Sequence, residues 1–186
     1  MAKLIYSVIM SLDGYVADAH GNFDWAEPDG EVHGFINDLE RSVGTHLLGR
    51  KMYGVLVAWD DADGFANAPD YVQDFAALWQ TTDKVVYSRA LDSVSGAKTR
   101  LERDFDPDAV RQMKVQREAD ISIGGPNLAE RAFQAGLVDE CHLFVAPVVI
   151  GDGTRGLPNG VRVALRLVDE RRFDNGMVYL RYHTEP

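Results

Sequence analysis

Apolar runs and amphipathic stripes alternate along the first part of the chain. Residues 4–10 form a continuous apolar run rich in Ile and Val, which ends at Asp13 and Gly14 and is typical of a strand covered on both faces. Residues 28–31 then lead into apolar positions at three- and four-residue spacing, which form one helical stripe of Val32, Phe35, Ile36 and Leu39. The first strand is therefore expected near the middle of a sheet, followed by a helix.

Strands and helices keep alternating up to Gly136. The further predicted strands are residues 45–48, 84–87 and 120–123. The further predicted helices are residues 69–80, 108–118 and 127–135, the last of them stopped by Gly136. Such alternation indicates βαβ units, which build parallel sheets.

After Asp139 the chain becomes mostly extended. Residues 141–150 and 161–169 have the pattern of strands, and Asn175 with Gly176 predicts a two-residue hairpin turn into residues 177–183. We therefore predict an α/β fold of three layers. It consists of a mixed, mostly parallel central sheet flanked by helices, with a C-terminal antiparallel hairpin, and residues 1–186 form one domain.

Composition restricts the partners and the compartment. The formal net charge of −10 argues against general affinity for nucleic acid or anionic membranes, which bind clustered Lys and Arg. Cys141 is the only cysteine, so neither an internal disulfide nor a thiolate metal site can form. A reducing, cytoplasmic location fits. The histidines lack metal-ligand spacing, and no metal site is predicted.

Glycine and basic residues gather after three predicted strands. Open α/β sheets bind ligands at the carboxyl ends of their strands. Helix N-termini attract phosphate there, and glycine lets an anion approach the backbone. Each segment alone favours a plain turn, but together, in order, the three are candidates for a phosphate site. The residues are Gly49, Arg50, Lys51 and Met52; Ser88 and Arg89; and Gly124, Gly125, Pro126, Asn127 and Leu128.

Four stretches of the chain resemble one known family. They read SLDGYVAD at 11–18, LLGRKMY at 47–53, ISIGGPNLAERAFQAGLVDE at 121–140 and VAPVVIGDG at 145–153. Over nearly the whole chain they resemble the C-terminal reductase domain of the bifunctional riboflavin-biosynthesis deaminase/reductase, within the dihydrofolate reductase superfamily. The resemblance implies a dihydrofolate-reductase-like fold and NADPH-dependent reduction of a ribosylaminopyrimidine. The zinc deaminase of the bifunctional enzyme cannot be built from one cysteine, so a standalone reductase domain is expected.

The same resemblance assigns roles to the three segments. It implies that residues 49–52 hold the cofactor phosphates, that Ser88 and Arg89 meet the adenosine 2′-phosphate, and that residues 124–128 line the pyrophosphate and nicotinamide side. A basic residue near the adenosine ribose also favours NADPH over NADH. The resemblance further implies a homodimer, and the C-terminal hairpin offers a sheet edge that needs cover.

Three carboxylates near the end of the first strand are candidates for catalysis, because hydride transfer needs a proton donor beside the reduced group. They are Asp13, Asp29 and Glu31, and Trp25 resembles the aromatic residue of that region. Each has a structural alternative. Asp13 can bond the backbone amides of its turn, and Asp29 and Glu31 can serve as helix N-terminal charges.

Other functions remain open at this point. A dihydrofolate- or pterin-type reductase would share the cofactor site and differ in substrate. A non-catalytic module would bind the dinucleotide without turnover. A purely structural protein would bind no dinucleotide at all.

Overall fold

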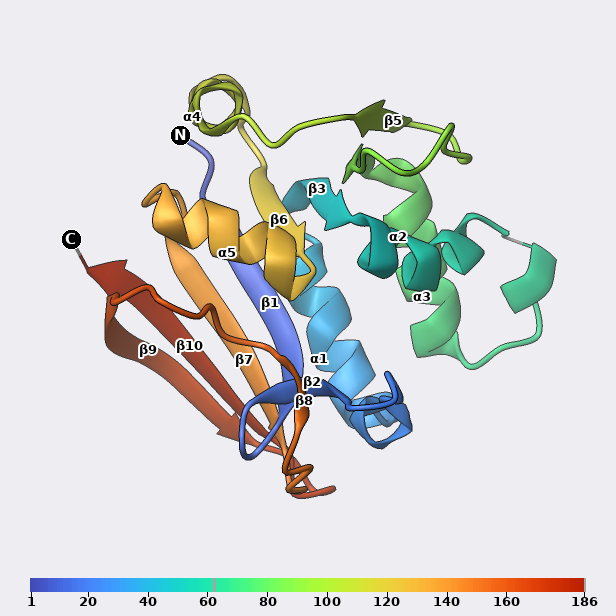
Figure 1. The fold of residues 1–186 in the computed structure, drawn as a ribbon. Coiled ribbons are helices and arrows are strands. Elements are labelled where there is room, and N and C mark those ends of the chain that lie inside the picture. Colours follow the sequence, from blue (N-terminus) through green and yellow to red (C-terminus); the bar gives the residue numbers. More distant parts are fainter. Residues whose placement is uncertain (62, 186) are drawn as a thin grey trace.

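The computed structural model describes residues 1–61 and 63–185, and its centre is an eight-stranded sheet (Figure 1). In spatial order the strands are β5 (Thr99–Glu102), β4 (Asp83–Tyr87), β3 (Val43–Gly49), β6 (Asp120–Gly124), β1 (Leu4–Ser11), β7 (Glu140–Ala146), β10 (Val178–Glu185) and β9 (Ala164–Arg172). Neighbours from β5 to β7 are parallel, whereas β10 runs antiparallel to both β7 and β9. The prediction of a mixed, mostly parallel sheet with a C-terminal hairpin is confirmed.

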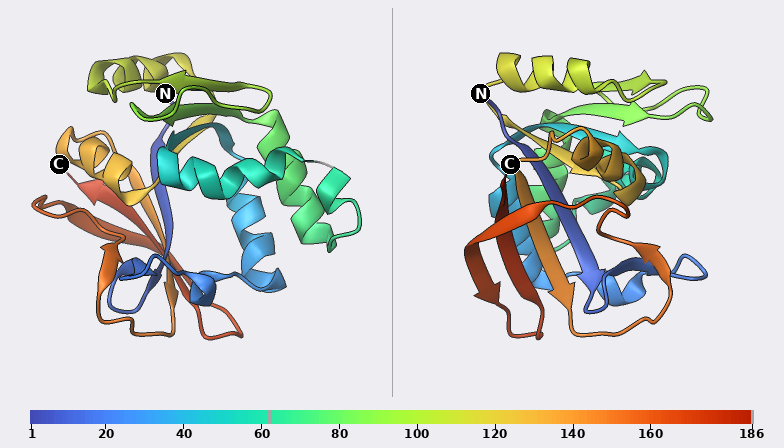
Figure 2. Two further views of the ribbon diagram at one scale, coloured as in Figure 1. Left: turned by 45° about the vertical axis from the view of Figure 1, so that its right-hand side comes forward. Right: turned by 60° about the vertical axis from the view of Figure 1, so that its left-hand side comes forward.

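Helices cover both faces of this sheet (Figure 2). They are α1 (Gly30–Glu40), α2 (Arg50–Leu56), α3 (Asp70–Thr81), α4 (Pro107–Gln116) and α5 (Pro126–Gln134), with short 3-10 turns at Asp24–Ala26, Val57–Asp60 and Asp63–Phe65. Successive residues of a strand point to opposite faces of the sheet and pack against different helix layers. Leu47 and Val85 pack in the cluster that includes α4 and α5, whereas Leu48 and Val86 pack against Trp79 of α3. This alternation produces the predicted three layers.

The late strands differ from their predicted bounds. The strand predicted over 141–150 is β7 and ends at Ala146, because Pro147 has no N–H to continue a ladder. The strand predicted over 161–169 lies at Ala164–Arg172, and every residue of it is exposed. An exposed edge strand buries neither of its faces, so the apolar pattern could not locate its end.

Three short strands were not predicted. β5 extends the sheet beyond β4, while β2 (Tyr15–Asp18) and β8 (Gly153–Arg155) form a separate antiparallel pair. Strands of three or four residues are too short to show alternation. Over the described ranges, no helix is long and apolar enough to cross a membrane.

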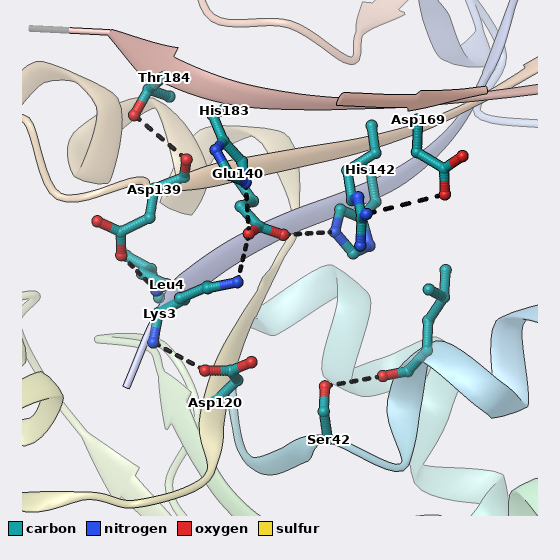
Figure 3. Close-up of polar contacts among 12 residues, drawn as sticks. Lys3, Leu4, Ser42, Asp120, Asp139, Glu140, His142, Asp169, His183 and Thr184 are labelled. Carbon is teal, nitrogen blue, oxygen red and sulfur yellow. Dashed lines mark hydrogen bonds and ion pairs between the residues drawn. The ribbon is translucent and has the colours of Figure 1, made fainter. Parts of the chain in front are cut away.

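A buried carboxylate joins the N-terminus to the C-terminal strands (Figure 3). Glu140 is 3% exposed. Its Oε1 lies 2.6 Å from Lys3 Nζ and 2.9 Å from His183 Nε2, and its Oε2 lies 3.1 Å from His142 Nε2. Burial alone would raise the pKa of Glu140, but the hydrogen bonds with Lys3 and His142 outweigh it, and the pKa is lowered from 4.5. Glu140 is therefore ionised at neutral pH.

Replacing Glu140 by Gln is expected to lower the free energy of unfolding by roughly 3 kcal/mol at pH 7, because it removes one partner of a buried charge cluster. The folded-state pKa lies below 4.5, so the contribution of this carboxylate is present above that pH and is lost as the pH falls through the folded value. Urea unfolding at several pH values checks this. The exposed Glu185→Gln control should change stability by less than about 0.5 kcal/mol. If Glu140→Gln lowered the free energy of unfolding by the same amount at all pH values, Glu140 would not be the ionised group that we assign.

Candidate functional site

The segments that follow three parallel strands meet in one open groove of about 240 Å³. β3 lies between β4 and β6, and Leu48 is in register with both Val86 and Gly124. The three strands therefore end at the same level of the sheet, and all three predicted segments contribute to the groove. Its lining residues are Gly49, Arg50, Tyr87, Ser88, Arg89, Arg103, Phe105, Asn127, Leu128 and Arg131.

Glycines allow the first and third segments to touch. Gly125 has a φ of 97°, a conformation that L side chains rarely adopt. A Cβ built there would lie 3.8 Å from Gly49 Cα and 3.6 Å from Met52 Cβ. A Cβ on Gly124 would lie 3.1 Å from Met52 Cγ. These glycines therefore set the close packing of α2 against the start of α5.

Some predicted residues support the groove without lining it. Met52 packs beside the two glycines, and Pro126 occupies the first helical position of α5, where its missing N–H is no loss. Lys51 is exposed and is not among the lining residues. The cofactor roles of all these residues stay predictions.

The groove is strongly basic within an acidic chain, since it contains four arginines. Among the described residues, Arg50 and Arg131 make no ion pair. Arg89 donates to Asp104 Oδ1 from Nε at 2.7 Å and also from Nη2. Arg103 donates to the backbone carbonyl of Ser88 at 3.2 Å. Guanidinium groups gathered in this way suit the oxygens of a phosphate.

The start of α5 adds one backbone donor to these charges. Its N-cap residue, Gly125, offers no side chain to bond the first amides of the helix. Pro126 has no N–H and Leu128 N donates to Gly125 O at 3.2 Å, so the Asn127 N–H stays available, and the helix dipole favours an anion beside it. Asn127 and Leu128 of this first turn line the groove.

Four lining residues were missed from the sequence. Arg103 and Phe105 follow β5. Because ligands bind at the carboxyl ends of strands, a prediction of β5 would have identified both residues as candidates. Tyr87 and Phe105 form an aromatic wall, with ring centroids 5.5 Å apart. Arg131 lies four residues after Asn127 on α5, and this spacing places both on one helix face.

Asp13 lies at a different place, in the turn after β1. Its Oδ2 accepts from Gly151 N at 2.7 Å, and its Oδ1 accepts from Ser11 Oγ at 2.7 Å and from Ile150 N at 3.1 Å. These hydrogen bonds, led by that from Ser11, lower the pKa of Asp13 to about 2. At neutral pH this carboxylate can accept a proton or hydrogen bond but has no proton to donate.

The other two carboxylates hold the start of α1. Asp29 Oδ1 accepts from Val32 N at 3.0 Å as the N-cap. Glu31 pairs with Arg171 Nη2 at 2.8 Å and accepts from Asp174 N at 3.1 Å, which ties α1 to the C-terminal hairpin. None of the three carboxylates lines the groove, and their catalytic roles stay predictions. Over residues 1–61 and 63–185, no group of three or more His, Cys, Asp or Glu side chains could hold a metal ion.

A family model and a curated relative both match nearly the whole chain. The family model described as the RibD C-terminal domain matches residues 2–179. The uncharacterized protein YyaP of Bacillus subtilis (strain 168) is 28% identical over 185 residues, which are 97% of this chain and 94% of YyaP.

Two solved structures share the fold. A riboflavin-biosynthesis-type protein from Shewanella sp. PV-4 superposes with a TM-score of 0.77 at 20% identity, over 100% of both chains. The diaminohydroxyphosphoribosylaminopyrimidine deaminase/5-amino-6-(5-phosphoribosylamino)uracil reductase of Thermotoga maritima gives 0.64 at 13% identity, over 98% of this chain and 56% of that one. The fold is therefore the dihydrofolate-reductase-like α/β fold, and this chain spans just over half of the Thermotoga protein.

Gly125→Ala is expected to lower the free energy of unfolding by about 1–2 kcal/mol, because alanine is strained at this positive φ. The matched control is Gly34→Ala in α1, where a Cβ meets nothing within 4 Å. That change should raise stability by roughly 0.5–1 kcal/mol, the difference in helix propensity. Chemical denaturation measures both, and a neutral or stabilising Gly125→Ala would refute the conformational argument.

Proposed function

This chain belongs to the RibD C-terminal domain family, and we propose that it is an NADPH-dependent reductase whose cofactor lies in the arginine-lined groove. The observation that carries the proposal is the convergence of three strand ends on four arginines. A chain with net charge −10 gathers these cations in one groove, which favours a polyanionic ligand.

The residues of the groove fit NADPH, which carries a pyrophosphate and a 2′-phosphate. Arg50 and Arg131 suit the pyrophosphate, because they are charged donors that make no ion pair among the described residues. The Asn127 N–H at the start of α5 adds a neutral backbone donor. Ser88 and Arg89, at the end of β4, suit the phosphorylated adenosine ribose. The bound cofactor would supply the hydride, and the chain would hold it beside the substrate.

The proposed substrate is a phosphorylated ribosylaminopyrimidine, the class named for the Thermotoga relative. The turn after β1 and the loop at 150–155 would receive it. Asp13 holds this loop through Gly151 N, and as a carboxylate it can orient a hydroxyl or amine of the substrate. Arg155 lies over the ring of Tyr15, with 5.5 Å between its Cζ and the ring centroid, and adds positive charge for a phosphate.

NADPH is expected to bind more tightly than NADH, and Arg89→Ala should remove most of that preference, because the guanidinium meets the 2′-phosphate. Arg131→Ala should weaken both cofactors by about tenfold, as loss of a charge-assisted hydrogen bond implies. Isothermal titration calorimetry measures all of these affinities. Arg111→Ala is the matched control, since Arg111 pairs with Asp108 on α4 and does not line the groove.

The outcomes separate the competing functions. Absence of binding to either dinucleotide would leave only the fold and end the proposal. Binding without NADPH oxidation on a panel of ribosylaminopyrimidines and pterins would identify a non-catalytic module. Oxidation with a pterin alone would correct the substrate.

We also propose a homodimer formed through the C-terminal edge of the sheet. β9 is an edge strand and exposes the apolar side chains of Leu165, Leu167 and Val168. Such an edge needs cover in solution, and a second copy of the same strand can pair with it about a two-fold axis.

Light scattering at micromolar concentration should therefore give the mass of two chains. Leu167→Lys should shift the mass towards one chain, because it places a charge on the paired edge. Val115→Lys, at an exposed apolar position of α4, should leave the dimer intact. A monomeric wild-type protein would rule the dimer out.

A further inference from the structure

We infer that Asp104 sets the cofactor preference of the groove by competing with the 2′-phosphate of NADPH for Arg89. This inference rests on the proposed function, because it concerns how the same groove distinguishes two dinucleotides. It names a specificity-determining residue that does not itself line the groove.

The ion pair occupies the part of Arg89 that a phosphate would use. Nε and Nη2 of Arg89 both donate to Oδ1 of Asp104. These two N–H groups lie on one edge of the guanidinium, and that edge can bind two oxygens of a carboxylate or phosphate side by side. In the free protein Asp104 therefore takes the place of the phosphate.

One backbone hydrogen bond and one side-chain hydrogen bond hold the two partners opposite each other. Ser88 N donates to Glu102 O at 2.9 Å, and Arg103 Nη1 donates back to Ser88 O at 3.2 Å. The end of β4 is thus fastened to the end of β5, with Arg89 following one strand and Asp104 following the other. The competition is a consequence of parallel pairing, because it brings the two strand ends together.

The pair can be displaced. The side chains of Arg89 and Asp104 are 76% and 59% exposed, and an exposed ion pair contributes little net stability. A phosphate with nearly two charges is a stronger acceptor than one carboxylate. NADPH must displace Asp104 from Arg89, whereas NADH leaves the pair intact and offers ribose hydroxyls that the carboxylate can accept from.

The test measures the affinities of NADPH and NADH for Asp104→Asn and Asp104→Ala by calorimetry. Both variants should bind NADPH about fivefold more tightly, the upper value expected for freeing an exposed ion pair. NADH binding should stay equal or become weaker. The gain for NADPH should shrink as salt is raised, since it arises between exposed charges.

Asp108→Asn is the matched control. Asp108 is another exposed carboxylate of the same stretch and pairs with Arg111, so the variant removes one negative charge without freeing Arg89. It should leave the ratio of the two affinities unchanged. An equal change in that ratio for Asp108→Asn would show an effect of net charge alone and would overturn the inference.

A double variant tests whether Asp104 affects NADPH binding through Arg89. In an Arg89→Ala background, Asp104→Asn should no longer alter NADPH affinity, because no guanidinium is left to release. A gain that persists there would show direct repulsion of the cofactor and contradict competition for Arg89.

The failure of the inference can be distinguished from the failure of the proposed function. If wild type binds NADPH but both Asp104 variants have the same ratio of NADPH to NADH affinity as wild type, the inference fails while the proposed function stands. If wild type binds neither dinucleotide, the proposed function fails first.

Discussion

The alignment of three parallel strand ends is the constraint on which the candidate site depends. β4, β3 and β6 are neighbours in register, so the segments after them leave the sheet at one level. The hydrogen bonds of a parallel ladder fix that level, and a slip of one residue would move every side chain to the opposite face. Arg50, Ser88 and Asn127, which are far apart in sequence, line one groove for this reason.

Charge is distributed unevenly in this molecule. Its acidic residues fasten the fold, as Glu140 joins the N-terminus to β7 and β10 and Asp13 closes a loop. In the groove two arginines are left without an acidic partner among the described residues. The charges that can attract an anion are therefore charges that folding does not use. They form a basic groove in a chain that otherwise has an excess of carboxylates.

The carboxylates near the end of β1 and the start of α1 make structural hydrogen bonds. Asp29 caps α1, and Glu31 holds the C-terminal hairpin, so replacing either one changes stability as well as any chemistry. Asp13 has a pKa of about 2, which suits hydrogen-bond acceptance. A proton delivered at neutral pH therefore comes from a group other than the Asp13 carboxylate.

The sequence by itself determined the order of the helices and the longer strands, the fold class and three segments of the groove, because apolar periodicity and glycine placement act locally. Motifs such as LLGRKMY are local as well, and they indicated the family. Only the tertiary structure decided which of these residues are in contact with one another. β5 was too short to show a pattern, so Arg103, Phe105 and the pairing of Asp104 with Arg89 stayed hidden. Contacts between residues distant in sequence depend on strand register and helix packing, which no local pattern encodes.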